Sequence, residues 1–179
     1  MPWFETVTDL EAQANAIRTR RYGVIDVAGS QLVRVRLRPW PKIASVIEGK
    51  LWGEFLHRRV SGDRCSLYYN QPHRFSNFLA AAYAWSTRGC TLATIRMAVA
   101  ALDEIARIKR ADALLCDVIG SDISERLLAR WGWEKHAPSL FHRNYIKRFY
   151  GVYPTAGQPS SVDTIASPRA PVREAVLSR

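Results

Sequence analysis

The chain contains few cysteines and no long apolar run. Its 3 cysteines, Cys65, Cys90 and Cys116, are widely separated and form no C-x-x-C pair, which excludes a disulfide framework and favours a reducing, intracellular setting. The 4 histidines form no H-E-x-x-H motif, so no metal site is assigned. The longest apolar stretch, residues 78–85, is too short to cross a bilayer, and the acidic N-terminus lacks the basic start of a secretory signal. These absences predict a cytoplasmic protein that has no membrane partner.

The chain also lacks three common signatures of nucleotide-binding proteins and hydrolases. It contains no G-x-x-x-x-G-K-[ST], no G-x-G-x-x-G and no G-x-S-x-G motif. Their absence argues against a phosphate-loop nucleoside triphosphatase, a dinucleotide-dependent dehydrogenase and an α/β-hydrolase.

The charge of the chain is strongly positive. Lys and Arg number 26 against 16 Asp and Glu, which gives a formal charge of +10 at pH 7. Residues 151–179 contain three arginines and two acids, so a charge of +9 belongs to residues 1–150. A body of this charge attracts polyanions, whether nucleic acid, an anionic lipid surface or the phosphates of a cofactor. The sign of the charge does not choose among them.

One folded domain followed by a tail is the simplest division of the chain. With 179 residues, of which 47% are hydrophobic, the chain is long enough for one domain with its own core. The last segment contains four prolines among small polar residues, a composition typical of disordered extensions. We therefore expect a single domain over residues 1–150 and a disordered Pro/Ser-rich tail over residues 151–179.

The first half of the chain has the patterns of strands and short helices. A short helix is predicted over residues 9–18, and two strands over residues 22–27 and 32–37. The second of these strands alternates valine or leucine with arginine, the period of a half-buried strand; the residues are Val33, Arg34, Val35, Arg36, Leu37 and Arg38. Helical spacing predicts a helix over residues 42–57, followed by a turn at residues 61–63 and strands over residues 65–69 and 78–85.

A long amphipathic helix is predicted over residues 91–110. Its apolar residues from Leu92 to Ala106 form one stripe, and charged residues, Asp103 among them, lie away from that stripe. The short apolar run at residues 113–118 predicts a strand that is covered on both faces of a sheet.

A second helix and a last strand follow. Ser121 or Asp122 caps the helix, which stops at Gly132, and residues 140–150 form the strand. This order of elements predicts an α/β (α+β) fold with a mixed central sheet flanked by helices.

The loop before the long helix has the features of an anion site. Unpaired N–H groups and the positive end of the helix dipole lie at a helix start, where Arg88 adds a positive charge and Gly89 permits close approach. These features are the ones needed to bind a pyrophosphate group. The alternative is that Gly89 makes the turn and that Thr91 or Ser86 caps the helix.

Two cysteines have opposite expected properties. Cys90 lies at the helix start, which would lower the pKa of an exposed thiol, whereas Cys116 lies in the apolar strand and is expected to be a small buried hydrophobe.

The second half of the chain resembles a known superfamily. A strand, an R-G loop, a long helix, the strand DALLCDV, the helix ISERLLARW and Gly132-Trp133-Glu134 together resemble the core of the GCN5-related N-acetyltransferases. The resemblance covers residues 78–150 and implies an acyl-CoA N-acyltransferase-like fold in a divergent member. It implies acetyl-CoA or another acyl-CoA as cosubstrate and transfer of the acyl group to an amine, with a small-molecule or peptide acceptor left open.

The resemblance also implies a cofactor site. In that family the fourth strand and the loop after it hold the pantetheine and the pyrophosphate, and a later asparagine often contacts the cofactor. The corresponding positions are Tyr83, Ala84, Trp85, Arg88, Gly89, Cys90, Thr91, Leu92 and Ser121.

The chain departs from the family in its loop and in its catalytic positions. The family loop commonly reads Q/R-x-x-G-x-G/A, whereas Arg88 is followed directly by glycine. Leu128 stands where the family has a general-acid tyrosine, and the strand 78–85 has no carboxylate to act as a base. Acid and base would then come from other residues; the candidates are His142, Tyr145 and Tyr150. The alternative is a catalytically inactive binding module with the same fold.

A second interpretation uses the positive charge. Cations alternate with aromatic residues in the last strand, and arginines cluster in the first sixty residues. The residues are Arg143, Lys147 and Arg148 with Phe141, Tyr145, Phe149 and Tyr150, and Arg18, Arg20, Arg21, Arg58 and Arg59. Such a mixture can bind single-stranded nucleic acid through stacking and phosphate contacts; the alternative is a solvated edge strand protected by charge. The sequence leaves the oligomeric state open.

Overall fold

The structure, a computed structural model, describes residues 4–42, 61–118, 124–136 and 143–154. In chain order its elements are β1 (Glu5–Val7), α1 (Ala14–Thr19), β2 (Tyr22–Ala28), β3 (Gln31–Arg38), β4 (Arg64–Asn70), β5 (Phe78–Ser86), α3 (Leu92–Lys109), β6 (Ala113–Val118), α4 (Glu125–Arg130), β7 (Glu134–Lys135) and β8 (Arg143–Arg148).

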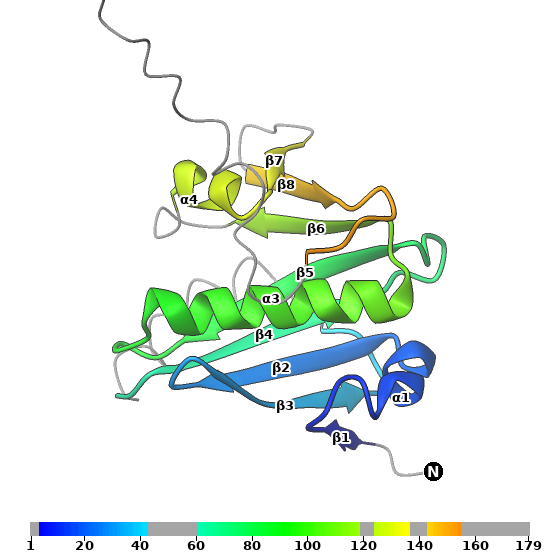
Figure 1. Ribbon diagram of the computed structural model, residues 1–179, viewed down its shortest axis with the longest axis horizontal. Helices are drawn as coiled ribbons and strands as arrows, with labels where there is room; N and C mark the ends of the chain where they lie inside the picture. The colour runs from blue at the N-terminus through cyan, green and yellow to red at the C-terminus, as the bar shows by residue number, and fades with distance from the viewer. Residues whose placement is uncertain (1–3, 43–60, 119–123, 137–142, 155–179) are drawn as a thin grey trace, which may run out of the picture.

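The strands form one mixed sheet of eight, in the order β1-β3-β2-β4-β5-β6-β8-β7. Its neighbouring strands are antiparallel except for β5 and β6, which run parallel and are connected through α3. Figure 1 shows α3 lying across the sheet, with α1 and α4 toward its two ends. The predicted α+β architecture with a mixed sheet and flanking helices is confirmed.

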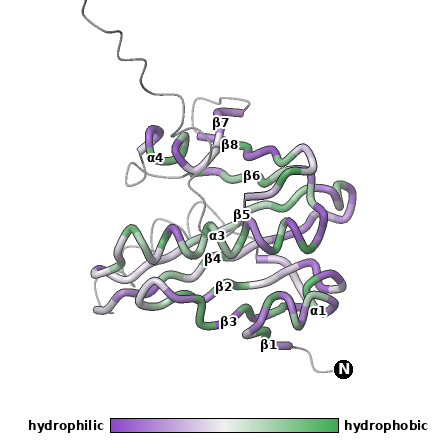
Figure 2. The backbone as a smooth tube through the Cα atoms, in the orientation of Figure 1, coloured by the Kyte–Doolittle hydropathy of each residue, from purple (hydrophilic) through white to green (hydrophobic). Residues whose placement is uncertain are grey.

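The core lies between the sheet and α3. Ile25, Leu67 and Leu79 point to it from three central strands, and Leu102 and Ile105 point to it from the helix. Figure 2 shows hydrophobic and hydrophilic residues alternating along α3, as expected for a helix with one buried face. None of the helices that the structure describes is long and apolar enough to span a membrane.

Two expectations for the first half are corrected. The first helix begins at Ala14 instead of residue 9, because residues 9–13 form a turn in which the Asp9 carboxylate accepts hydrogen bonds from the N–H groups of Glu11 (3.0 Å) and Ala12 (2.9 Å). Val33 is 49% exposed, whereas Val35 and Leu37 are buried as predicted. A β-bulge explains the exposure of Val33, because the register of β2 and β3 shifts between Asp26 and Val27.

Two expectations for the helices are also corrected. Asp103 belongs to the buried face of α3, whereas Leu92 is 54% exposed, so the buried stripe is rotated from the predicted one. The N-cap of α4 is Ser124, whose hydroxyl accepts from the N–H of Leu127; Ser121 and Asp122 lie outside the described residues.

Gly132, with a φ of 82°, ends α4 as predicted. The helix predicted over residues 42–57 falls almost wholly outside the described residues, as do residues 155–179 of the tail.

Candidate functional site

The parallel strands β5 and β6 separate before they end. Their pairing runs from Phe78 and Ala113 to Ala81 and Cys116 and stops there, although β5 continues to Ser86. A bulge at Ala82 accompanies the separation, since Tyr69 pairs with Ala81 and Tyr68 with Tyr83. Beyond Ala81, β5 is therefore paired with β4 on one side and not with β6 on the other.

The register shows which backbone groups this separation leaves unpaired. Thr87 continues the register of β5 opposite Arg64, and its N–H donates to the Arg64 carbonyl at 3.0 Å. Because backbone groups alternate between the two sides of a strand, Tyr83 and Trp85 direct theirs to β4, whereas Ala84 and Ser86 direct theirs away from it. The predicted cofactor strand thus presents the N–H and C=O groups of Ala84 and Ser86 at an edge that β6 does not cover.

The loop after β5 is held tightly by neighbouring loops. The buried Thr87 hydroxyl accepts from the N–H of Arg64 (3.0 Å) and donates to the Gly62 carbonyl. A Cβ atom on Gly89 would lie 3.1 Å from that same Gly62 oxygen. Close approach of the two loops is therefore sufficient reason for the glycine, a reason different from the turn that the sequence suggested.

The N-terminus of α3 already holds a carboxylate. Thr91 is the N-cap, and its hydroxyl accepts from the N–H of Thr94. Asp63 accepts from the Thr91 N–H (2.8 Å) and the Thr91 hydroxyl (3.1 Å), and the hydrogen bond from that N–H is the main cause that lowers the pKa of Asp63. The N–H groups of Leu92 and Ala93 have no hydrogen-bond partner in the part of the chain that the structure describes. The anion site predicted here is thus shared between an internal carboxylate and these two donors.

The Cys90 thiol does not meet the condition of exposure on which the expectation of a lowered pKa depends. Partial burial raises its pKa, and the negative charge of Asp63 raises it further. Cys116 packs against the core as predicted, and burial raises its pKa to about 12. Neither thiol has the character of a nucleophile.

The predicted strand residues lie on different faces of β5. Tyr83 pairs with Tyr68, and their rings meet edge to face with centroids 5.7 Å apart. Because the adjacent Tyr69 is fully buried in the core under α3, Tyr68 and Tyr83 belong to the opposite face of the sheet. The ammonium of Lys42 lies 5.7 Å from the Tyr83 ring centroid. Arg88 and Ala84 are exposed, and Trp85 is half-buried.

Of the catalytic candidates, Tyr145 is the one that the structure brings near the strand separation. It pairs with Cys116, which pairs with Ala81, so the three residues form a row across β8, β6 and β5 at the last pair before the strands part. Tyr145 is 2% exposed, and its hydroxyl makes no hydrogen bond of normal geometry with the described residues, but it interacts with the Glu125 carboxylate of α4, whose pKa is lowered by Lys135 and also by this hydroxyl. Leu128 on α4 is buried in the same core.

Tyr150 is not brought to this place. It is 83% exposed in the turn after β8. His142, and Ser121 of the cofactor set, lie outside the described residues.

The nucleic-acid surface predicted on β8 is not formed. Tyr145, Lys147 and Phe149 are buried, and Lys147 donates to Asp103 at 2.7 Å. Arg148 is paired with Glu134 of β7. The alternation of cations and aromatics in this strand reflects core packing and cross-strand ion pairs instead of a ligand surface.

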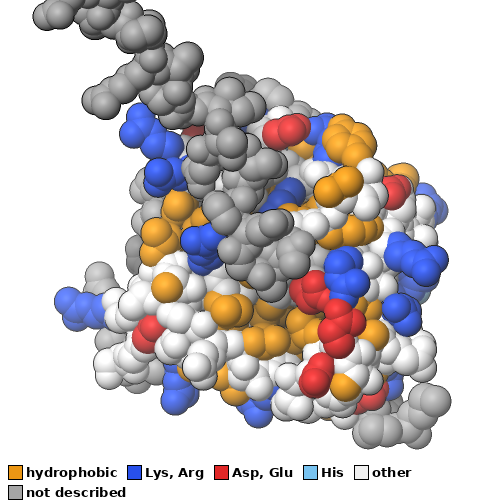
Figure 3. Space-filling model, in the orientation of Figure 1, with side chains coloured by type: hydrophobic (Ala, Val, Ile, Leu, Met, Phe, Trp, Pro, Cys, Tyr) orange, Lys and Arg blue, Asp and Glu red, His pale blue; other side chains and the backbone are white. Residues whose placement is uncertain are grey.

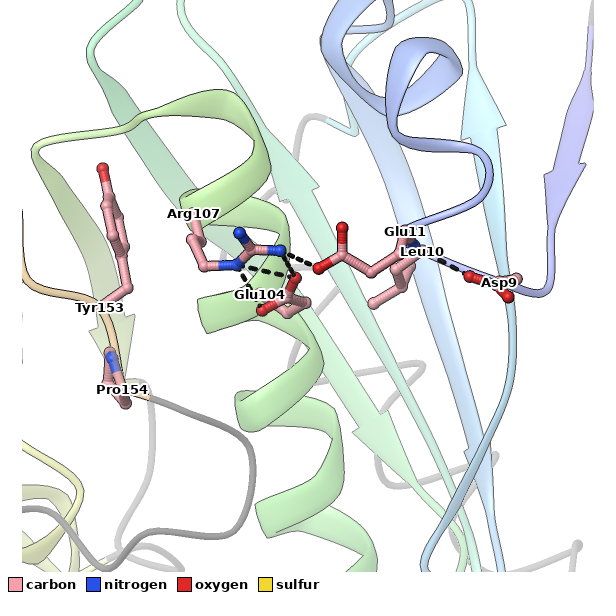
Figure 4. A pocket seen from close by; sticks show the side chains of 7 residues that line it. All are labelled: Asp9, Leu10, Glu11, Glu104, Arg107, Tyr153 and Pro154. Atoms are coloured by element: carbon pink, nitrogen blue, oxygen red, sulfur yellow. Dashed lines mark hydrogen bonds and ion pairs between the residues drawn. The ribbon is translucent and has the colours of Figure 1, made fainter.

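Sequence reasoning missed an acidic groove of about 500 Å³ beside α3. It is lined by Asp9, Leu10, Glu11, Glu104, Arg107, Tyr153 and Pro154. Figure 4 shows Arg107 between Glu104 and Glu11; its Nε donates to both Glu104 oxygens at 3.0 Å, and its Nη2 donates to Glu11. Three segments far apart in the sequence form this groove, so no local pattern could have identified it.

The described residues contain no group of three or more His, Cys, Asp or Glu side chains that could hold a metal ion. Comparisons with protein-family models, with curated proteins and with solved structures found no match to this chain.

Proposed function

We propose that the protein binds an acyl-CoA along the edge of β5 that β6 leaves after Ala81, and that it transfers the acyl group to an amine. The separation of β5 from β6 after Ala81 carries the proposal. In sheets with parallel strands, ligands bind beyond the carboxyl ends of the strands, where neighbouring strands part. A chain of amides such as pantetheine can pair with an open strand edge in the way that an added strand does.

The residues at the edge match the parts of such a ligand. Ala84 and Ser86 supply donors and acceptors for the pantetheine amides. The N–H groups of Leu92 and Ala93 at the positive end of the 18-residue helix α3 suit the pyrophosphate, with the exposed Arg88 close by in sequence. Asp63 opposes this by placing a like charge at the same helix end, so we expect phosphate binding to weaken the contact between Asp63 and Thr91.

The chemistry requires few groups from the protein. The amine nitrogen attacks the thioester carbon, a C–N bond forms, the C–S bond breaks and the nitrogen loses a proton. Tyr145 is the proposed proton donor to the departing sulfur, because its hydroxyl is buried and the residue lies in the row that ends at Ala81; the hydroxyl would have to leave the Glu125 carboxylate to act in this way. No Asp or Glu occurs in β5, so the amine would have to arrive neutral or lose its proton to water.

The alternative is a binding module that takes up acyl-CoA without transferring the acyl group. The buried Leu128 and the absence of a carboxylate from β5 favour it. The two functions share the binding step and differ in the release of coenzyme A.

Binding is tested by isothermal titration with acetyl-CoA. Leu92→Pro removes one N–H donor at the first residue of α3, where proline is tolerated, and Thr91 already has the extended φ of −81° and ψ of 156° that precede a proline. We expect this variant to bind at least about 10-fold more weakly, since a hydrogen bond to a charged group is lost. Leu92→Ala keeps the donor and is expected to bind normally. No saturable heat with the natural chain would refute the proposal.

Transfer is tested by following thiol release with a panel of amines. Tyr145→Phe should retain acetyl-CoA binding and lower the rate of thiol release by about 100-fold or more, the usual contribution of a general acid. Binding without thiol release from the natural chain, over the whole panel, would assign the protein to the binding-module alternative.

A further inference from the structure

Cations from several separate segments meet at the end of the molecule where α3 finishes. They come from α1, from the approach to β2, from the loop between β4 and β5, and from the last turn of α3. The residues are Arg18, Arg20, Arg21, Arg74, Lys109 and Arg110, and we call this surface the basic end. Figure 3 shows lysine and arginine side chains along the same edge of the molecule, on the right of the view.

Hydrogen bonds to uncharged oxygens hold three of these cations, Lys109, Arg21 and Arg18, against neighbouring segments. The Lys109 ammonium donates to the Arg20 carbonyl (2.6 Å) and to the Gln71 side-chain oxygen (3.0 Å). Arg21 donates to the Pro72 carbonyl at 3.3 Å, and Arg18 donates to the Ile108 carbonyl at 3.1 Å. All four acceptors are uncharged oxygens, so the positive charge of the three donors persists.

Several cations elsewhere in the structure have carboxylate partners. Arg107, two residues before Lys109, is paired with Glu104 and Glu11, and Arg36 on β3 is paired with Asp26 at 2.7 Å. At the basic end the carboxylate of Asp112 accepts from the Asn77 amide instead. Burial, and then the neighbouring charge of Arg21, lowers the pKa of Lys109 to about 8. Positive charge is thus concentrated here at a cost to the folded chain, which a bound anion would offset.

An exposed aromatic ring stands beside these cations. Phe75, next to Arg74 at the tip of the loop between β4 and β5, is 60% exposed. The loop is held by hydrogen bonds from the Gln71 amide to the Ser76 carbonyl (2.5 Å) and from the Phe78 N–H to the Phe75 carbonyl (3.0 Å). The Phe75 ring meets the Phe78 ring edge to face, with centroids 6.5 Å apart. An exposed ring held in this way next to an arginine is an arrangement on which an unpaired base stacks while a phosphate contacts the cation.

We propose that the basic end binds single-stranded nucleic acid, with Phe75 stacking on a base and Arg74 and Arg110 contacting phosphates. The exposed ring favours this ligand over duplexes and lipid headgroups, which offer phosphates but no unstacked base. The surface is independent of the proposed acyl-CoA site, because the two lie at opposite ends of α3, about 27 Å apart along the helix.

The test uses the full chain and a fluorescent oligothymidylate, with anisotropy measured over a range of salt concentrations. Phe75→Ala should weaken binding about 5- to 100-fold, because the stacking of one base is lost. The salt dependence should stay unchanged, because every contact between a cation and a phosphate is kept. Arg74→Ala with Arg110→Ala should also weaken binding, and the slope of log affinity against log salt should become shallower by about 0.7 for each arginine.

The matched control is Arg96→Ala with Arg126→Ala, which removes the same charge from exposed positions on α3 and α4. It should keep most of the affinity. Equal losses in the two double variants would overturn the proposal, since net charge alone would then explain binding. It would also be overturned by the absence of saturable binding at low salt, by normal binding of Phe75→Ala, or by a preference for duplex DNA or anionic vesicles. Acetyl-CoA should not compete with the oligonucleotide, so the outcome does not depend on the proposed transferase function.

Discussion

Lys109 is the residue whose environment departs furthest from what its sequence neighbours suggest. In the helical pattern it is a charged residue on the outer face of α3, whereas in the structure its ammonium is partly buried and bonded to the Arg20 carbonyl and to Gln71. Helical spacing gives no information about these partners, because they lie 89 and 38 residues away in the chain. The consequence is a lysine pKa of about 8, below the ordinary 10.5.

This pKa predicts a specific pH dependence of stability. Because the folded state binds the Lys109 proton less tightly than the unfolded state does, the free energy of unfolding should rise as pH increases from about 8 to 10.5. Side-chain exposure limits the expected gain to about 1–2 kcal/mol. Urea unfolding of the natural chain and of Lys109→Gln over this pH range measures the effect as a difference. Parallel curves for the two proteins would contradict it.

At the scale of elements, one buried ion pair connects α3 to β8. Asp103 and Lys147 meet at 2.7 Å, with side chains that are 10% and 9% exposed. Burial raises the pKa of Asp103, and Lys147 opposes that shift without cancelling it. One oxygen of Asp103 has no hydrogen-bond partner within the described residues. Buried pairs of this kind contribute little net stability, but a single partner left alone is costly.

Mutations of this pair should therefore be strongly non-additive. Asp103→Asn leaves the Lys147 charge buried and should lower the free energy of unfolding by about 3–5 kcal/mol. The double variant Asp103→Leu with Lys147→Met removes both charges and should unfold within about 1 kcal/mol of the natural chain. Thermal and urea unfolding of the single and the double variant measures the two losses in the free energy of unfolding. A loss in the double variant as large as the loss in Asp103→Asn would contradict the expected coupling.

The start of α3 and the end of α4 show which helix limits local residue preferences can predict. Thr91 as N-cap and Gly132 as the stop of α4 follow from local residue preferences, and both are confirmed. The carboxylate at the start of α3 does not follow from such preferences, because Asp63 is 28 residues from Thr91 in the chain. The raised pKa of Cys90 follows first from its partial burial and then from this carboxylate, and neither can be derived from the local sequence.

At the scale of the whole molecule, the segment after β8 returns to the start of β6. The Phe149 N–H donates to the Asp112 carbonyl at 2.9 Å, and the Tyr153 hydroxyl donates to the Ala111 carbonyl at 3.0 Å. The rings of Phe149 and Tyr153 lie 4.8 Å apart. Residues 151–154, which composition groups with the tail, thus include a tyrosine that packs against the body; the domain boundary at residue 150 stays a prediction.

Truncation tests that packing. A chain that ends after Pro154 keeps the Tyr153 contacts and should unfold with nearly the free energy of the full chain. A chain that ends after Tyr150 loses a half-buried ring and its hydrogen bond, and should be less stable by about 1–3 kcal/mol. Calorimetric unfolding of the two truncated chains and of the natural chain measures how much residues 151–154 and the residues after Pro154 each contribute to stability. Equal melting temperatures for the two truncated chains would show that Tyr153 does not stabilise the fold.

Local sequence patterns were enough to predict the kinds and approximate limits of the main described elements, because alternation, helical spacing and capping act between residues a few positions apart. The tertiary structure alone decided the strand order, the bulge that exposes Val33, the burial of Asp103, and the separation of β5 from β6 that defines the candidate site. Each of these depends on which distant segments meet. The packing of the whole core determines which distant segments contact one another, and no local sequence pattern contains that information.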